Sequence, residues 1–375
     1  MKKMIKLSLV AAVAVAGLTT TASASAMEDA IKNTDLSGYI RYRYTNGKTA
    51  SESNEYKTVF KVKSKVNDNV SAFIKAAGAN ATTNASGDAD PDQTAIKEAK
   101  FVINAGGATI IAGKQGLQTP FAALADQQGT GVVALYPVSK ALTLAAGWYT
   151  NTDASALGAD LGGNNITAVA AIGSAASVNY ALWYASISEN DLGTNNATLA
   201  GTTAGASAIN LNVSAKVGPV SVALNHAEVD FSSNAAAIND TTTKQTRLVV
   251  SGQAGPATVT VGYVATGKDG GDVTLGDTDA TANFDLETVS ARDTKDANIW
   301  YIGATAKVAA ATVGLEYVKT SDIDGTVAGD VEAKEAKLSV AYAMSKNFKI
   351  SAFITDSKVG TAEMDFSRIE MKYTF

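Results

Sequence analysis

The stretch Glu55-Tyr56-Lys57-Thr58-Val59-Phe60-Lys61-Val62-Lys63-Ser64-Lys65-Val66 decides the fold. Lysines occupy positions 57, 61, 63 and 65, whereas positions 56, 60, 62 and 66 hold aromatic or apolar side chains. Because successive side chains of a strand point to opposite faces, this pattern predicts a β-strand with one charged face and one apolar face.

The same alternation recurs along the chain. It places Arg41 and Arg43 on one face of 36–44, and Arg368, Glu370 and Lys372 on one face of 364–375. We therefore predict an all-β fold of about 18 strands. Their ranges are 36–44, 55–66, 70–77, 95–104, 108–114, 131–137, 142–150, 165–173, 177–186, 207–217, 220–230, 244–253, 257–266, 297–308, 311–319, 332–343, 348–356 and 364–375.

The connections between these strands alternate in length. Short joins such as 67–69 and 218–219 are followed by long polar joins such as 78–94 and 187–206. A soluble β-sandwich alternates polar and apolar residues too, but it has no reason to sort its connections in this way. Short periplasmic turns and long extracellular loops are typical of transmembrane antiparallel β-barrels, so we expect such a barrel in the outer membrane.

Aromatic residues also cluster near the predicted strand ends. Ordinary strand aromatics would scatter along the strands, whereas girdles at two membrane interfaces collect at both rims. The pattern favours girdles, with Tyr44, Trp148, Tyr184 and Tyr317 at the long-loop rim and Tyr136, Tyr342, Phe348 and Tyr373 at the other.

The first 26 residues resemble an export signal. Lys2, Lys3 and Lys6 precede a short apolar run, and Ala24-Ser25-Ala26 offers small residues for cleavage. A retained membrane anchor is the alternative, but the apolar run is shorter than the roughly 20 residues of a spanning helix. We predict a cleaved signal peptide at 1–26 and one barrel domain at 27–375.

Composition narrows the class of function. The chain has no cysteine, so neither disulfides nor thiolate metal sites stabilise it. Its 31 basic and 36 acidic residues become 28 and 36 once the three signal lysines are removed, a net charge of −8. This balance excludes nucleic acid as a partner.

The charged faces predict what lines the barrel. Arg or Lys facing hydrocarbon costs about 2–4 kcal/mol at the membrane midplane, so a charged face requires water. We predict a water-filled lumen, because a barrel of this size is too wide for side chains to fill. The predicted pore-lining residues are Arg41, Arg43, Lys57, Lys61, Lys63, Lys65, Lys114, Arg247, Arg368, Glu370 and Lys372.

The connection 115–130 differs from the other long joins because it is apolar and contains Gln115, Pro120, Phe121 and a single carboxylate, Asp126. Such a loop is poorly solvated outside, so we expect it to fold into the lumen and constrict it. The alternative is a loop packed at the rim or at a trimer axis.

Two further features were weighed as sites. Asp88, Asp90 and Asp92 have alternate spacing that suits Ca²⁺, although a solvated acidic loop explains them as well. The only histidine, His226, has no neighbouring nucleophile or paired acid. The sequence therefore predicts no enzyme, no required cofactor, and calcium as the one candidate ion.

Several segments resemble the major outer-membrane protein porins of Campylobacter and related epsilonproteobacteria. They are 27–32 with 35–44, Ile111-Ala112-Gly113-Lys114-Gln115, 129–132, and the C-terminal Met371-Lys372-Tyr373-Thr374-Phe375. The resemblance implies an 18-stranded homotrimer for ions and small hydrophilic solutes, some cation preference, and luminal calcium in some members. It also implies that Tyr373 and Phe375 form the signal read by the barrel assembly machinery.

We therefore predict a passive diffusion porin. A structural or adhesive barrel, whose surface loops bind cells or ligands, is the alternative. A substrate-specific channel would need an aromatic ladder inside, and only Tyr149, Trp183 and Tyr301 fall on the luminal parity.

Overall fold

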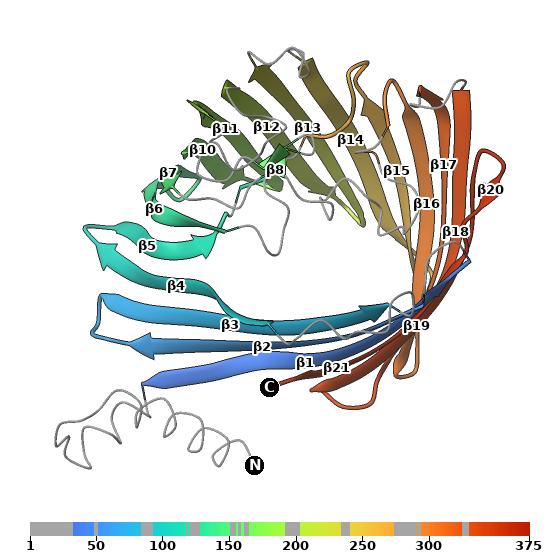
Figure 1. Ribbon diagram of the computed structural model, residues 1–375, viewed down its shortest axis with the longest axis horizontal. Coiled ribbons are helices and arrows are strands. Elements are labelled where there is room, and N and C mark those ends of the chain that lie inside the picture. Colours follow the sequence, from blue (N-terminus) through green and yellow to red (C-terminus); the bar gives the residue numbers. More distant parts are fainter. Residues whose placement is uncertain are drawn as a thin grey trace.

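The computed structural model describes residues 33–48, 52–83, 93–117, 119–120, 128–150, 155–156, 159–160, 165–191, 203–233, 241–273, 291, 294–324 and 330–375. Its strands form one closed sheet and a short separate hairpin (Figure 1). Among the described residues, no helix is long and apolar enough to cross a membrane.

Long strands make up the closed sheet. Their bounds are β1 (Thr34–Gly47), β2 (Ser53–Lys65), β3 (Val70–Thr83), β4 (Gln93–Ala105), β5 (Ala108–Gly116), β6 (Gln128–Ser139), β7 (Leu142–Thr150), β10 (Ile166–Ala175), β11 (Val178–Asp191), β12 (Thr203–Val217), β13 (Val220–Ser233), β14 (Thr241–Ala254), β15 (Ala257–Thr266), β16 (Asn298–Val308), β17 (Ala311–Asp324), β18 (Asp330–Ala343), β19 (Phe348–Val359) and β21 (Phe366–Thr374). Three two-residue strands complete the set: β8 (Ser155–Ala156), β9 (Ala159–Asp160) and β20 (Ala362–Glu363).

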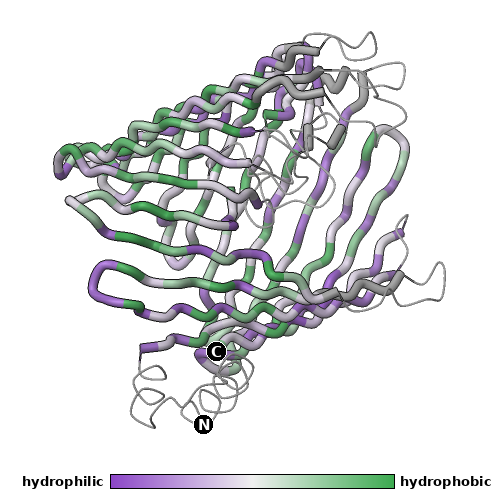
Figure 2. The backbone as a smooth tube through the Cα atoms, turned by 60° about the vertical axis from the view of Figure 1, so that its left-hand side comes forward, coloured by the Kyte–Doolittle hydropathy of each residue, from purple (hydrophilic) through white to green (hydrophobic). Residues whose placement is uncertain are grey.

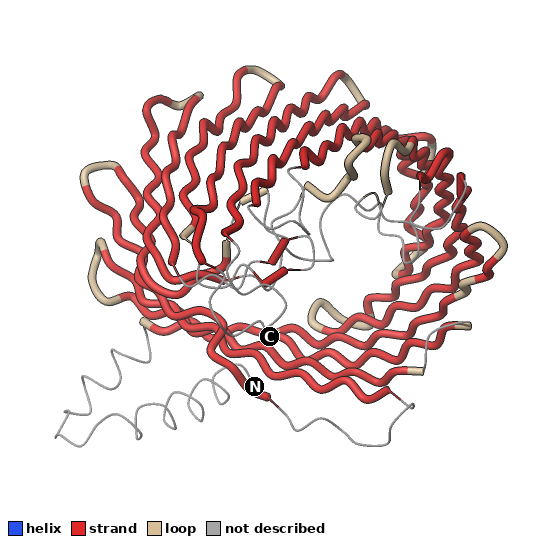
Figure 3. Tube along the Cα trace, turned by 45° about the horizontal axis from the view of Figure 1, so that its top comes forward, coloured by secondary structure: helices blue, strands red, loops and turns tan. Residues whose placement is uncertain are grey.

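Every long strand pairs antiparallel with the next one along the chain, and β1 pairs with β21. The result is a closed antiparallel barrel of 18 strands, which confirms the predicted fold class. The β8–β9 hairpin interrupts the connection between β7 and β10, and Figures 1 and 3 draw it within the ring of strands.

The seam between the first and last strands is held at the very end of the chain. The backbone N–H groups of Gly38 and Phe375 each donate to the carbonyl oxygen of the other at 3.0 Å. A side chain at position 38 would collide with the backbone carbonyl of Val59, so glycine permits this close approach. The Phe375 ring packs 5.8 Å from the Phe60 ring, between centroids, and seals the seam.

The two faces of the sheet differ in chemistry, and Figure 2 shows hydrophobic and hydrophilic residues alternating along the strands. Side chains converge on the concave side of a curved sheet and diverge on its convex side. Accordingly, one parity carries fully buried side chains such as Val59, Val229 and Glu335, and forms the inner face. The other parity leaves large apolar side chains exposed, including Ile40, Tyr42, Phe101, Trp148, Leu182, Leu211, Trp300, Leu315, Leu338, Ile354 and Ile369.

The two rims of the barrel differ as the sequence predicts. The short turns include 106–107, 218–219 and 255–256, where Gly106, Gly218 and Gly255 adopt positive φ angles of 57°, 60° and 62°. In the turn after β2, the Asn67 side-chain oxygen accepts hydrogen bonds from the backbone N–H groups of Asn69 and Val70, both at 2.9 Å. The described strand ends that the long connections join lie at the opposite rim.

Several strands are longer than predicted at the long-loop rim. β3 continues to Thr83 instead of 77, and β12 begins at Thr203 instead of 207. These ends are rich in Gly, Ala, Thr and Asn, which resemble loop composition. They remain in register because the neighbouring strand supplies backbone partners, and the sequence of one segment does not reveal its neighbour.

Candidate functional site

Charged side chains gather on the inner face of the described strands, and basic ones outnumber acidic ones. The basic residues are Arg41, Arg43, Lys57, Lys61, Lys63, Lys65, Lys75, Lys100, Lys216, Arg247, Lys307, Lys337, Lys349, Arg368 and Lys372. The acidic residues are Asp35, Glu55, Glu98, Glu316, Glu335 and Glu370. We call the basic residues of β21, β1 and β2 in this set the basic wall.

Two arginines of the basic wall are neutralised by ion pairs. In register, Arg43 of β1 lies between Glu55 of β2 and Glu370 of β21. Its guanidinium approaches Glu370 at 2.9 Å and Glu55 at 3.8 Å. Arg41 also pairs with Glu55 and lies 3.9 Å from Glu370. The four groups form a compact cluster that fixes both arginines against the wall.

Lysines on the same wall remain open to the lumen. Lys61 and Lys63 are exposed on the inner face of β2, and no described carboxylate lies within 4.0 Å of either ammonium group. Lys65 instead donates to Asp68 in the adjoining turn at 2.7 Å and holds the pKa of that carboxyl below its ordinary value. Lys61 and Lys63 are therefore the charges of this wall most available to passing ions.

Aromatic rings support the rest of the wall. Two of them, Tyr39 and Phe353, lie on the inner face in addition to Tyr149, Trp183 and Tyr301, so the prediction of only three luminal aromatic residues is wrong. The Lys372 ammonium lies 4.4 Å from the centre of the Tyr39 ring. Arg368 lies 5.0 Å from the centre of the Phe353 ring, and its Nε donates to Thr45 Oγ1 at 3.1 Å. These contacts hold the long cationic side chains near the wall, which keeps their charge in the lumen at a defined position.

A second region of the inner face is apolar. Its buried cluster lies on β7 and β10 to β13 and comprises Tyr149, Ile166, Ala168, Ala185, Ile187, Ala206, Ala208, Ala227 and Val229, with Leu117 and Val273 from connections. Leu117 follows β5 in the connection that the sequence predicts to enter the lumen, and its side chain is only 7% exposed. The beginning of that connection therefore packs onto the inner wall.

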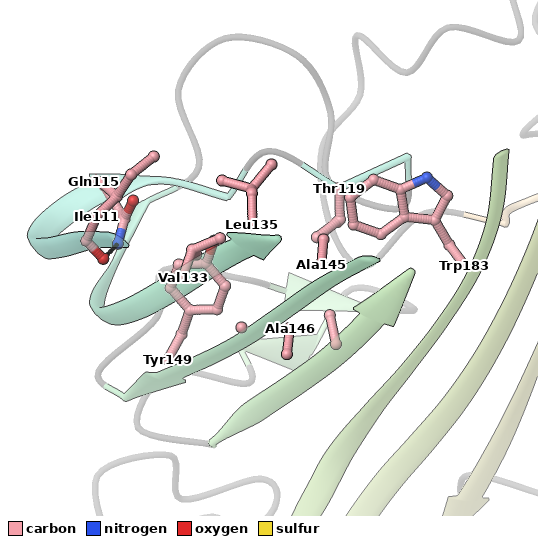
Figure 4. Close-up of a pocket in the computed structure, with 11 residues that line it drawn as sticks. Ile111, Gln115, Thr119, Val133, Leu135, Ala145, Ala146, Tyr149 and Trp183 are labelled. Atoms are coloured by element: carbon pink, nitrogen blue, oxygen red, sulfur yellow. Dashed lines mark hydrogen bonds between the residues drawn. The ribbon is translucent and has the colours of Figure 1, made fainter. Parts of the chain in front are cut away.

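Figure 4 shows a pocket beside this contact, inside the barrel. Thr119 lines it together with inner-face residues that include Gln115, Tyr149 and Trp183. Gln115 is buried, and its amide nitrogen lies 3.3 Å from the carbonyl oxygen of Gly131. This amide links β5 to the inner face of β6 at the point where the connection leaves the strand.

The connection after β15 also covers the inner face, which the sequence did not predict. Gln245 donates to the carbonyl oxygen of Gly271 at 3.2 Å, and the Thr243 hydroxyl donates to that of Asp272. Val273 then packs into the apolar cluster. The run of aspartates in 267–296 suggests a solvated loop, and the single apolar residue Val273 was too weak a signal to overturn that interpretation.

A third region contains buried charges. Glu335 is fully buried and Lys337 nearly so, both on the inner face of β18. Beside them on β16, the Tyr301 hydroxyl donates to Glu316 at 3.0 Å. Buried charges need polar partners, so this region is a fixed polar network and not an open conducting surface.

One predicted pore-lining residue lies on the other face. Lys114 pairs in register with Ala99 and Thr130, on the parity that carries the exposed Phe101 and Val132. Its ammonium donates to the carbonyl oxygen of Ile96 at 2.9 Å. The prediction that Lys114 lines the pore is therefore wrong. The other predicted pore-lining residues lie on the inner face.

The remaining predicted site residues are only partly placed. Pro120 is half-buried, whereas Phe121, Asp126, Asp88, Asp90 and Asp92 lie outside the described residues. Within the described part of the chain, no group of three or more His, Asp or Glu residues could hold a metal ion. The predicted pore-lining residues do not include Glu55, which forms ion pairs with Arg41 and Arg43. Its position two residues before Lys57 places it on the same face and could have identified it.

Solved structures of three bacterial proteins share the fold of this barrel. OpdK of Pseudomonas aeruginosa, solved with vanillate, aligns at a TM-score of 0.72 and 13% identity, covering 92% of this chain and 99% of that one. OccK9 (OpdG) of the same species aligns at 0.71 and 14%, covering 92% and 99%. OccAB4 of Acinetobacter baumannii aligns at 0.69 and 12%, covering 92% and 98%. At these identities the likeness establishes the fold alone.

A search of curated protein sequences found no match. The family model described as "Campylobacter major outer membrane protein" matches residues 1–373. The match spans nearly the whole chain, including the segments 27–32, 35–44, 111–115 and 129–132. The chain therefore belongs to the Campylobacter major outer membrane protein family, and it is an outer-membrane porin that forms a channel for small solutes.

Proposed function

We propose that this porin is a passive channel with two unlike walls, a basic wall on β21, β1 and β2 and an apolar wall on β7 and β10 to β13. The observation that carries the proposal is the exposure of Lys61 and Lys63 within a closed barrel, because ammonium groups on that face require water. In this proposal the two lysines attract the anionic groups of passing solutes, and neutral solutes diffuse without binding.

We also propose that the connection after β5 narrows the lumen. The burial of Leu117 against inner-face residues supports this, because it ties the start of the connection to the wall. The loop as a whole then sets the bore, as expected for the predicted constriction residues Gln115, Pro120, Phe121 and Asp126.

Liposome swelling tests the channel and its bore together. Leu117→Asp places a carboxylate in an apolar cluster, at a cost of several kcal/mol unless the residue leaves the wall. We expect Leu117→Asp vesicles to swell faster in large neutral sugars, and Leu117→Met vesicles to match wild type. If wild-type vesicles do not swell even in the smallest sugar, the passive channel is ruled out and the adhesive barrel becomes the better account.

Further predictions extend the proposal beyond the barrel wall. We propose that the chain is cleaved after Ala26 and that it assembles as a homotrimer. We also propose that the barrel assembly machinery recognises Tyr373 and Phe375. Calcium at Asp88, Asp90 and Asp92 stays a prediction. We assign no catalytic role, since His226 lies on the outer face and contacts Thr246 Oγ1 at 2.8 Å, in keeping with a structural residue.

A further inference from the structure

Three lysines form a row on the outer face at the long-loop rim. Lys319 of β17 pairs in register with Lys334 of β18, which pairs in register with Lys358 of β19. Directly opposed side chains in an antiparallel pair have Cβ atoms about 4.5–5.5 Å apart. The row therefore brings three ammonium groups within reach of one small anion.

Like charges directly opposed across strands are destabilising, so such a row requires compensation. A described acidic group compensates it directly only at the Lys319 end. Glu332 lies 3.3 Å from Lys319, and Glu363 pairs in register with Lys358 but bonds to Lys48, whose pKa it raises.

The centre of the row and its Lys358 end stay open. Lys334 and Lys358 are exposed, and no described carboxylate lies within 4.0 Å of either ammonium group. A further outer-face acid, Asp356, lies two residues before Lys358 on β19 and pairs in register with Ala336. The open positive charge of the row therefore faces outward, above the apolar band of the barrel.

An apolar groove runs down the outer face of the same strands. It is lined by Tyr44, Val313, Leu338, Val340, Ala352, Ile354 and Ile369, among others, and has a volume of about 420 Å³. Val340, Ala352 and Ile369 lie side by side in register on β18, β19 and β21. Ala352 has the smallest side chain of the three and therefore forms the floor of the groove. At about 3.4 Å per residue, Leu338 lies about 14 Å below Lys334 along the strand.

We propose that a phosphorylated lipid of the outer leaflet binds here, with its phosphate on Lys319, Lys334 and Lys358 and an acyl chain in the groove over Ala352. Two independent features support one occupant, because the cationic row lies near the long-loop rim and the groove begins about 14 Å below it, toward the hydrocarbon. A charged headgroup without an acyl chain would leave the groove unfilled. A neutral lipid would leave the lysines without an anionic partner.

Native mass spectrometry of the detergent-solubilised full chain tests the site. The probes are bisphosphorylated lipid A, its fully dephosphorylated form, and inorganic phosphate. The main variant is Lys334→Gln with Lys358→Gln, and the matched control is Lys114→Gln with Lys244→Gln, which removes two other outer-face lysines at the same rim. Heat-modifiable migration on gels confirms that each variant is folded.

We expect the main variant to bind lipid A about 25-fold more weakly, at about fivefold per lysine, and the control to stay within about twofold of wild type. We expect Ala352→Leu, which fills the groove and keeps every lysine, to weaken lipid A severalfold. Equal losses in the main and control variants would overturn the site. Equal binding of the dephosphorylated lipid would do so too, and inorganic phosphate that displaces lipid A at equal concentration would identify a free-phosphate site instead.

Discussion

Replacing Lys61 and Lys63 together by glutamate is expected to make the channel about threefold more permissive to cations and about threefold less permissive to anions at 0.1 M salt. The double variant changes four unit charges on the inner face of β2. At about 10 Å from an ion each unit contributes about 0.4 kcal/mol in water, and screening at this ionic strength reduces the sum to about 0.6 kcal/mol.

The reversal potential of the channel under a salt gradient measures this change. The matched control is Lys140→Glu with Lys346→Glu, which makes the same change of charge in two short turns outside the lumen. We expect the control to leave the reversal potential nearly unchanged. Equal shifts in both variants would mean that net charge sets selectivity, and that the basic wall has no special role.

A second large effect is expected from arginine at position 211. Leu211 lies near the middle of β12 on the outer face and is 37% exposed, whereas its neighbour Asn212 lies on the inner face. Leu211→Arg therefore places a cation in hydrocarbon, and we expect it to lower the free energy of unfolding by about 2–4 kcal/mol.

A substitution at the neighbouring position tests whether arginine destabilises β12 irrespective of the face on which it lies. Asn212→Arg changes the same strand by the same residue type, but the new cation faces the water of the lumen. Urea unfolding in lipid vesicles is expected to show nearly wild-type stability for Asn212→Arg. Equal destabilisation by both variants would contradict the assignment of the two faces.

The sequence predicts the faces of a strand well where alternation is complete. In 55–66 every second residue from Glu55 is charged except Val59, and the structure places the lysines of that stretch on one face. Lys114 shows where this approach fails. The residues before it are Thr109-Ile110-Ile111-Ala112-Gly113, which carry no alternation. The face to which each of these side chains points is set by pairing with β4 and β6. The pairing of β4 with β3 itself shifts by one residue between Lys75 and Ala76 of β3.

The two inner coverings differ in how far the sequence predicts them. Leu117 belongs to an apolar connection that the sequence predicts to enter the lumen, whereas Val273 follows a run of polar residues, and its burial depends on alanine-rich strands far away in sequence. The row Lys319, Lys334 and Lys358 is similar, because its members lie on three strands and meet only through register. Features that one strand carries are predictable, whereas features that pairing creates are not.

The conductance of the purified wild-type protein in a planar bilayer tests the central claim most directly. A barrel with a hydrated lumen is expected to insert in discrete steps, each with a stable current that is proportional to voltage. Stable insertion of the folded protein with no current, at any voltage that the bilayer tolerates, would contradict the open channel on which this account depends.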